Sequence, residues 1–290
     1  MVMGPTHAMS GAAVGLAVAQ ILPEQWGGVT TAEETFIYAG LAAGAALLPD
    51  LDAPSATVSR SFGPVTQVIS RFTENIAQTF VNVTRGRKDK PCKNGHRTAT
   101  HTIWAALAAG VGATALIGAF GKTAVIGLLF FLLGLGIRGL LPEWSKKTDW
   151  LIVTGLSAAL AYAVWSYVPE ESFGVFLGSA ITVGCLTHML GDLATKQGIP
   201  AFAPLLPLKG RRWWNLKLPK FLSIRANGPA DRILLAGFTI AVIAQIGLVA
   251  SGNMRDVMVD LLPFEVVAQD PGQDLGQDYL GQDLGLGLSP

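Results

Sequence analysis

Residues 96–121 read HRTATHTIWAALAAGVGATALIGAFG, and in this stretch a pair of histidines stands directly before a long apolar run. The run from Ile103 to Gly121 contains no charged residue. An apolar α-helix needs about 20 residues to cross the hydrocarbon core of a bilayer. The stretch therefore predicts a transmembrane helix, with His96 and His101 where a basic loop meets the membrane.

The composition places the whole chain of 290 residues in the same class. Only 14% of the residues are charged, whereas about a quarter are charged in an average soluble domain. Half are hydrophobic and 34 are glycine, which is typical of membrane helices whose backbones approach closely. The net charge of +1 gives no electrostatic reason to expect a nucleic-acid partner.

Seven apolar runs are long enough, or nearly so, to be membrane spans, which predicts an all-α, polytopic helical membrane protein. The first two runs are short and rich in Ala and Gly, so each is equally consistent with a buried or re-entrant helix. The runs are roughly 8–23, 35–49, 103–121, 123–137, 150–168, 172–191 and 233–254.

The basic residues predict the orientation of these spans. Of the 21 Lys and Arg, 19 lie in the loops 50–102, 138–149 and 192–232, and only Lys122 and Arg255 lie elsewhere. Cytoplasmic loops of membrane proteins carry such an excess of basic residues. We therefore expect a multi-pass protein of the plasma membrane, with its N-terminus and these three loops in the cytoplasm.

The loop at 53–95 is an insertion that contains a predicted amphipathic helix over 64–83. Its apolar residues recur at helical spacing, which favours either a helix lying on the membrane or a soluble cap on other loops. They are Val65, Val68, Ile69, Phe72, Ile76 and Phe80.

Two further segments have distinctive compositions. The sequence GRRWWNLKLPK at 210–220 mixes tryptophans with basic residues, which favours an anchor at the lipid headgroups over a nucleic-acid patch. The repeats of Gly-Gln-Asp-Leu near the C-terminus have no core-forming periodicity, so 252–290 is predicted to be a disordered tail. Residues 1–251 then form a single membrane-embedded domain.

All the histidines, together with three aspartates, fall at the predicted cytoplasmic ends of spans or just inside the adjoining loops. Taken singly, each has an ordinary interpretation as a helix cap, a headgroup contact or a buried hydrogen bond. Four separate elements nevertheless carry them to one side of the membrane, which favours one shared site. They are His7, Asp50, Asp52, His96, His101, His188 and Asp192.

The local spacing of these residues suits metal binding. His188 and Asp192 are four residues apart and share one helical face. His96 and His101 converge if His96 stays in the loop while His101 enters the first helical turn. Arg97, between them, is interpreted as a topological anchor. Imidazole nitrogen with carboxylate oxygen is a donor set for zinc, and manganese and iron are the alternatives.

A metal ion at this position predicts hydrolysis. Metal-activated water attacks esters at neutral pH, and a phosphoester is a more natural substrate here than an amide. Asp52 or Asp50 is the candidate for activating water. Asp50 is also a candidate ligand, with His7, His96, His101, His188 and Asp192.

Several ordered motifs resemble a known family. A Thr-His near the N-terminus, LLPDLD, HRTATHT and THMLGDLATKQGIPAFAP resemble the membrane-bound, metal-dependent hydrolase family typified by the LexA-regulated inner-membrane protein YdjM. The resemblance runs from about residue 4 to about residue 250. It implies an inner-membrane hydrolase with the His and Asp set above as its metal site. Family members often show Arg-Thr-Gly followed by an acid; here SIRANGPADR stands instead, so Arg225 is a weaker candidate for binding a substrate phosphate.

The preferred function is therefore hydrolysis of a lipid-linked or small phosphoester substrate at the cytoplasmic face of the bilayer. A metal-ion or proton transporter is the main alternative, because His and Asp inside membranes also line ion pathways. A transporter, however, should place such residues near the midplane or on both sides of the membrane. A third interpretation is a non-catalytic membrane protein with a structural metal.

Overall fold

The structure is a computed structural model that describes residues 3–141, 144, 149–167 and 173–261. The regular elements in this part of the chain are all helices. Its only β pairings are isolated bridges in the loop 194–228. The helices, with η for 3₁₀, are α1 (Gly4–Ala19), η1 (Glu24–Trp26), α2 (Ala32–Ala45), η2 (Pro49–Asp52), η3 (Val58–Arg60), α3 (Pro64–Thr84), η4 (Ala99–His101), α4 (Ile103–Phe120), α5 (Lys122–Leu140), α7 (Trp150–Tyr167), α8 (Phe173–Leu193), α9 (Pro229–Ala250) and α10 (Met254–Leu261).

Each of the seven predicted apolar runs is a helix, but not all of them are long enough to cross a bilayer. The helices α4, α5, α8 and α9 are both long and apolar enough. The helices α1 and α2 have 16 and 14 residues, which correspond to about 24 Å and about 21 Å against a core of about 30 Å. The all-helical class is thus confirmed for the described residues, in which four helices are candidate spans; the count of seven spans stays a prediction.

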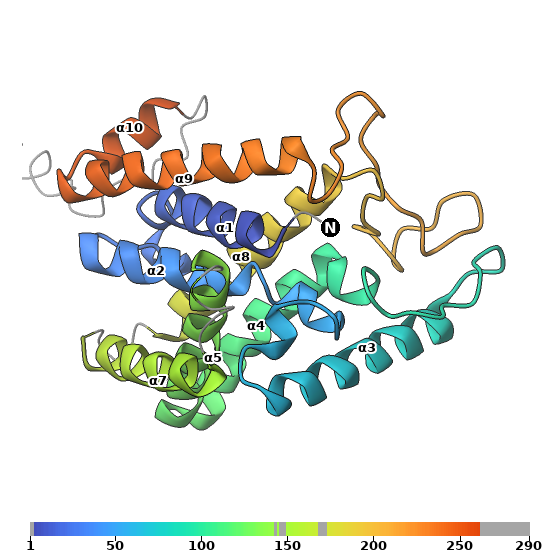
Figure 1. Cartoon of the computed structure of the whole chain (residues 1–290), viewed down its shortest axis with the longest axis horizontal. Coiled ribbons are helices and arrows are strands. Elements are labelled where there is room, and N and C mark those ends of the chain that lie inside the picture. The colour runs from blue at the N-terminus through green and yellow to red at the C-terminus, as the bar shows by residue number, and fades with distance from the viewer. Residues whose placement is uncertain (1–2, 142–143, 145–148, 168–172, 262–290) are drawn as a thin grey trace, which may run out of the picture.

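The short helix α2 lies between α1, α5 and α8 (Figure 1), and small residues let these helices meet. At Gly184 of α8, an added Cβ would lie 2.4 Å from the carbonyl oxygen of Ala42 in α2. No side chain fits at that distance, so glycine sets the spacing between α2 and α8. This contact lies one turn before His188 and therefore fixes how closely His188 approaches the end of α2.

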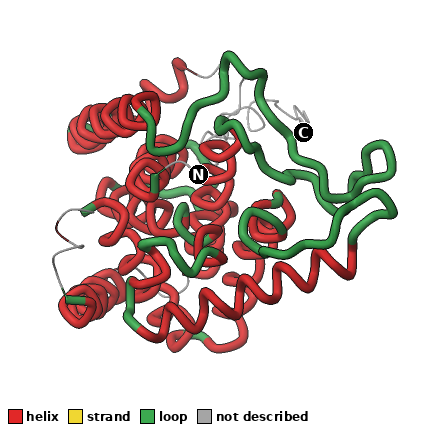
Figure 2. Tube along the Cα trace, turned by 45° about the vertical axis from the view of Figure 1, so that its right-hand side comes forward, coloured by secondary structure: helices red, strands yellow, loops and turns green. Residues whose placement is uncertain are grey.

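The antiparallel arrangement brings four helix ends to one end of the bundle. The side chain of Thr114 in α4 donates to the carbonyl oxygen of Gly174 in α8 at 2.9 Å, so the end of α4 meets the start of α8. At the opposite end, the end of α8 meets the start of α4, the end of α2 and the start of α1, because His188 lies against His101, Ala46 and His7. Figure 2 shows the long loops on one side of the helices.

The predicted amphipathic helix is confirmed as α3, which packs against η2 and η3. The predicted tail needs a correction, because Met254–Leu261 form α10. Met254 is fully buried with Leu16 and Val249, and this packing holds α10 against α1 and α9. The Gly-Gln-Asp-Leu repeats lie outside the described residues.

Candidate metal centre

Five buried side chains meet at the end of the bundle where the four helix ends converge. Their potential ligand atoms form two overlapping groups that share His188, and within each group the atoms lie within 4.8 Å of one another. One group is His7, His188 and Asp192, and the other is Asp50, His101 and His188. Four elements contribute: α1, η2, η4 and α8.

The end of α2 determines the orientation of His188. After Ala45 the helix tightens into i to i−3 hydrogen bonds, and the last carbonyls of a helix lack partners within it. His188 Nδ1 lies 2.8 Å from one of these, the carbonyl oxygen of Ala46. A carbonyl only accepts hydrogen bonds, so Nδ1 carries the proton and the lone pair of Nε2 faces the site.

A similar chain of hydrogen bonds orients His101. The hydroxyl of Thr100 donates its single proton to Asp52 Oδ2, and its oxygen lies 2.9 Å from His101 Nδ1. Thr100 must therefore accept from Nδ1, which leaves the lone pair of His101 Nε2 facing the site. Asp52 thus acts through Thr100, as carboxylates do behind metal-binding histidines.

The two lone pairs point at the same place, because His101 Nε2 and His188 Nε2 lie 3.1 Å apart. Carboxylate oxygens add to the same region: Asp50 Oδ1 is 3.7 Å from His188 Nε2, and Asp192 Oδ2 is 3.5 Å from His101 Nε2. Two acceptors cannot hydrogen bond to each other. A cation or a proton between them is required to make the arrangement stable.

Two other groups of the cluster also lack hydrogen-bond partners. Neither ring nitrogen of His7 is hydrogen bonded, although the ring stacks on His188 at 3.8 Å and Nε2 lies 3.4 Å from Asp192 Oδ1. Asp50 Oδ1 likewise has no hydrogen-bond partner. Burial raises the pKa of Asp50, and the nearby His7 and His101 oppose this effect.

The charges of the cluster fit a divalent cation. The carboxylates of Asp50, Asp52 and Asp192 with the guanidinium of Arg97 leave two negative charges in a buried site when the histidines are neutral. Buried charge is costly unless it is compensated. Imidazole nitrogens with carboxylate oxygens are a donor set that zinc accepts, so these residues fit the predicted kind of metal ion.

His96 does not belong to either group of converging atoms. Its Nδ1 lies 2.5 Å from Asp52 Oδ1, and its side chain is 20% exposed. Burial lowers the pKa of His96, but the hydrogen bond and charge of Asp52 outweigh burial, so the pKa is raised overall. The helical turn that we expected to carry His101 is the short helix η4, which ends just before α4 begins.

The interpretation of Arg97 as a topological anchor is wrong. Its side chain is buried, and it pairs with Asp192 through Nη2 and through Nε, the latter at 2.6 Å from Oδ2. Two more hydrogen bonds reach Gln197 and Thr195. Arg97 adopts a positive φ of 57°, which is uncommon for a residue other than glycine. The sequence feature that could have indicated this role is the position of Arg97 between His96 and His101.

The weaker candidate Arg225 is exposed and makes no hydrogen bond or ion pair with the cluster in the described part of the chain. Asp231, the acid that follows Arg225 in SIRANGPADR, is in contrast fully buried. It accepts from the hydroxyl of Thr6 at 2.8 Å and from the backbone N–H groups of Met3 and Asn227. Asp231 therefore fastens α9 to the first turn of α1, next to His7.

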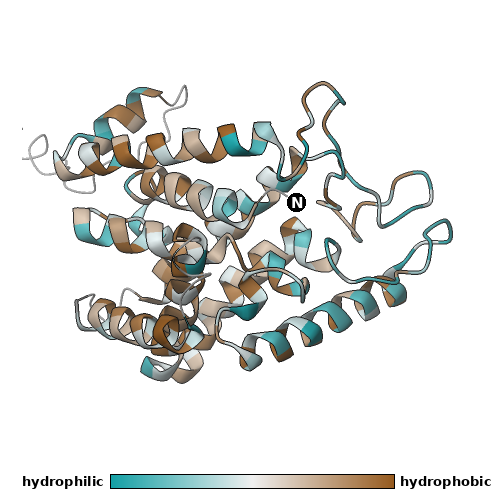
Figure 3. Ribbon diagram, viewed as in Figure 1, coloured by the Kyte–Doolittle hydropathy of each residue, from teal (hydrophilic) through white to brown (hydrophobic). Residues whose placement is uncertain are grey.

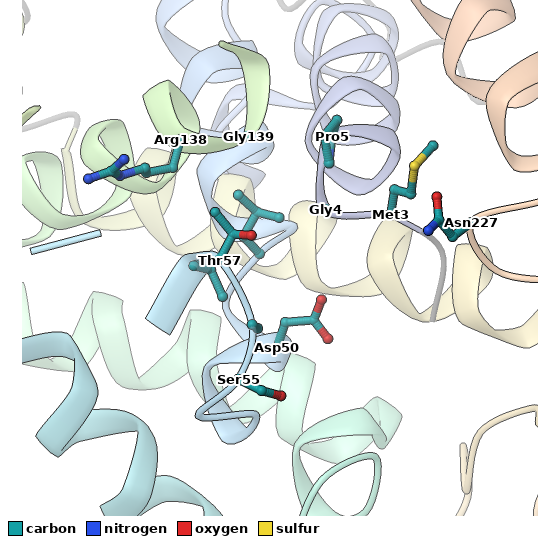
Figure 4. A pocket seen from close by; sticks show the side chains of 12 residues that line it. Met3, Gly4, Pro5, Asp50, Ser55, Thr57, Arg138, Gly139 and Asn227 are labelled. Carbon is teal, nitrogen blue, oxygen red and sulfur yellow. The ribbon is translucent and has the colours of Figure 1, made fainter. Parts of the chain in front are cut away.

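A cavity of about 400 Å³ leads to the cluster and includes Asp50 in its wall. Figure 4 shows the Asp50 carboxylate between Ser55 on one side and Met3 and Asn227 on the other. The wall combines polar and apolar side chains. The remaining members are Gly4, Pro5, Leu47, Ala56, Thr57, Val58, Arg138 and Gly139.

Comparison with known proteins agrees with the membrane architecture. No curated protein and no solved structure matches the chain. One protein family does match, described as YdjM inner membrane protein, over residues 1–141 and 150–254. The match covers α1 to α5 and α7 to α9, and hence every element that contributes to the cluster. The chain therefore belongs to the YdjM inner membrane protein family.

Proposed function

We propose that the protein is a membrane-bound, metal-dependent hydrolase that cleaves a lipid-linked or other phosphoester substrate at the membrane interface. The observation that carries this proposal is the pair of Nε2 lone pairs on His101 and His188, 3.1 Å apart and flanked by two carboxylates. Zinc is the preferred ion, with manganese and iron as alternatives.

In this proposal the ligands are one atom each from His7, Asp50, His101, His188 and Asp192, which hold one ion or two; His188 Nε2 has a single lone pair and binds one ion only. A divalent cation here would supply Lewis-acid activation of water and stabilise negative charge on the leaving oxygen. Because His96 is already hydrogen bonded to Asp52 at 2.5 Å, we assign it a positioning role rather than that of a ligand.

We assign the removal of a proton from water to Asp50 in preference to Asp52. Asp50 lines the cavity, and because a carboxylate has two oxygens, one can hold the ion while the other accepts the proton. Both oxygens of Asp52 are engaged, Oδ1 by His96 and Oδ2 by Thr100 and by the backbone N–H of Arg97. Asp52 therefore holds the histidines in place, and the raised pKa of Asp50 suits a general base that works nearer neutral pH.

The cavity favours a substrate with a polar head and an apolar part. Hydroxyls of Ser55 and Thr57 and the amide of Asn227 line it together with apolar Leu47 and Val58. A phosphoester attached to a lipid has this mixed character. A site at the end of the bundle also suits a reacting group at the headgroup level.

Metal analysis tests the proposal most directly. We expect purified wild-type protein to contain a stoichiometric divalent metal, and His188→Ala combined with Asp192→Ala to lose it. Cys185→Ala is the matched control, since Cys185 is equally buried on α8 but does not contribute to the cluster. Metal-free wild-type protein that still folds would rule out the metal centre.

Activity then separates an enzyme from the alternatives. The metal-loaded protein is assayed with phosphomonoester, phosphodiester and carboxylic ester substrates, and Asp50→Asn is expected to lose activity while keeping much of its metal. Metal uptake into proteoliposomes that depends on His188, without any hydrolysis, would establish a transporter instead. Metal without hydrolysis or transport would indicate a structural ion.

A further inference from the structure

The helix α3 packs against the rest of the protein by its small and polar side and not by its large apolar side. The residues buried in this contact are Thr66, Ser70, Ala77 and Val81, which recur at helical spacing. In a water-soluble protein, an amphipathic helix buries its apolar stripe instead. Figure 3 shows hydrophilic and hydrophobic residues alternating along α3.

The apolar stripe of α3 is exposed along its whole length. Its seven large side chains have exposed fractions from 37% to 79%, and the ring of Trp213 lies against that of Phe80 near one end, with centroids 6.1 Å apart. By helical spacing they form one stripe, about a third of a turn away from the packed side. The stripe consists of Val65, Val68, Ile69, Phe72, Ile76, Phe80 and Val83.

Beside this stripe lies a small basic pocket of about 310 Å³. It is lined by Pro54, Arg60, Gln67 and Arg71, of which Arg71 directly precedes Phe72 on α3. The loop that follows α3 adds exposed Arg85, Arg87 and Lys88. Two guanidinium groups that face one pocket next to an apolar stripe are complementary to a phosphate that is attached to acyl chains.

We propose that α3 lies in the headgroup region of the bilayer, with its apolar stripe at the acyl boundary, and that Arg60 and Arg71 bind the phosphate of an anionic phospholipid. The occupant is lipid because the stripe needs an apolar medium while the adjacent pocket needs an anion, and one anionic phospholipid leaflet supplies both. The inference does not depend on hydrolysis. Since α3 packs on η2, which carries Asp50, this docking sets the metal centre at the headgroup level.

The depth of α3 is measured on the full-length protein in nanodiscs of phosphatidylglycerol and phosphatidylcholine. A Cys92→Ser, Cys185→Ala background receives a single fluorescent label at Phe72→Cys, on the stripe, or at Glu74→Cys, on the opposite side of the same turn. Nitroxide-labelled acyl chains are expected to quench the label at position 72 several-fold more than that at position 74. Equal and weak quenching by lipid at both positions would overturn the proposal.

The same samples identify any other occupant of the stripe. If a second copy of the protein or its own residues 262–290 covered α3, the label at position 72 would be shielded from both lipid and aqueous quenchers. Removing residues 262–290 or diluting the protein would then restore quenching. Shielding of the label by a second copy of the protein, or by residues 262–290, would contradict docking of α3 on lipid.

The phosphate pocket is tested by Arg60→Gln with Arg71→Gln, and the control of equal charge is Arg232→Gln with Arg255→Gln, two exposed arginines far from α3 in the sequence. Native mass spectrometry of the detergent-extracted protein counts retained phosphatidylglycerol and phosphatidylcholine. We expect the variant at Arg60 and Arg71 to lose the preference for phosphatidylglycerol and the control variant to keep it. Competition by inorganic phosphate as effective as that by phosphatidylglycerol would point to a free anion and overturn the lipid assignment.

Discussion

A buried arginine holds one carboxylate of the metal centre in position. Arg97 contacts Asp192 through two nitrogens and is itself held by Gln197 and Thr195 from the segment after α8. A planar guanidinium makes such a fork, whereas an ammonium group cannot. Removing one partner of a buried ion pair typically costs about 3–5 kcal/mol, because the other charge is left uncompensated.

We therefore expect Arg97→Lys to weaken metal binding by about 10–100-fold, as changes behind metal ligands commonly do. The charge is retained in this variant, so the loss reflects positioning of Asp192. Arg87→Lys, at an exposed position in the preceding loop, serves as the control. Affinity is measured by competition with a chromophoric chelator, and an unchanged affinity for Arg97→Lys would show that Asp192 is held by other contacts.

At the scale of elements, the contact between α4 and α8 decides how the two central histidines meet. His101 stands just before α4 and His188 lies near the end of α8, so the spacing of these helices sets the distance between the rings. A Cβ added to Gly110 of α4 would lie 1.9 Å from Thr182 Oγ1 and 2.5 Å from the carbonyl oxygen of Gly178. The helices can approach this closely only because no side chain stands at that position.

Gly110→Val is consequently expected to force α4 and α8 apart, to destabilise the protein by about 1–3 kcal/mol and to reduce metal content. Gly112→Val is the matched control on the same helix, because nothing lies within 4 Å of an added Cβ there. Thermal unfolding in detergent and metal analysis report the two effects. Equal behaviour of both variants would mean that this contact does not position the histidines.

At the scale of the whole molecule, the folded chain gathers the metal centre and the long basic loops at one end of the bundle. The distribution of Lys and Arg predicts that this end faces the cytoplasm. The helix η1 lies against the start of α8, and thus at the end of the bundle away from the metal centre. If the metal centre faces the cytoplasm, η1 is therefore expected on the outer side of the membrane.

This orientation is tested by cysteine accessibility in intact cells. Lys93→Cys, in the loop before His96, is expected to react only with membrane-permeant reagents, and Glu24→Cys, in η1, with impermeant ones; both side chains are exposed. Cys92 and Cys185 are replaced in both variants. Labelling of position 93 by the impermeant reagent would show that the orientation is the reverse of the predicted one.

Sequence alone predicted most of the elements, because hydrophobic periodicity and helix length are local properties. It gave the positions of the seven apolar helices and of α3, and it singled out the His and Asp set that the fold brings together. The pairing of His188 with Asp192 follows from their spacing of four residues on one helix, and the structure confirms that they lie together, at 3.7 Å. Thr100, which precedes His101 in the sequence, accepts a hydrogen bond from its ring, whereas Thr187, which precedes His188, bonds only to its own helix.

Only the tertiary structure decided what these residues do to one another. The buried pairing of Arg97 with Asp192, the link from Asp52 through Thr100 to His101, and the approach of Asp50 to His188 all join residues from different elements. A sequence pattern reports which side of a helix is apolar, but not which neighbour it meets, and for this reason it could not show that α3 turns its apolar stripe outward. Local physics therefore determined the helices and the candidate residues, and long-range packing determined the roles that these residues can take.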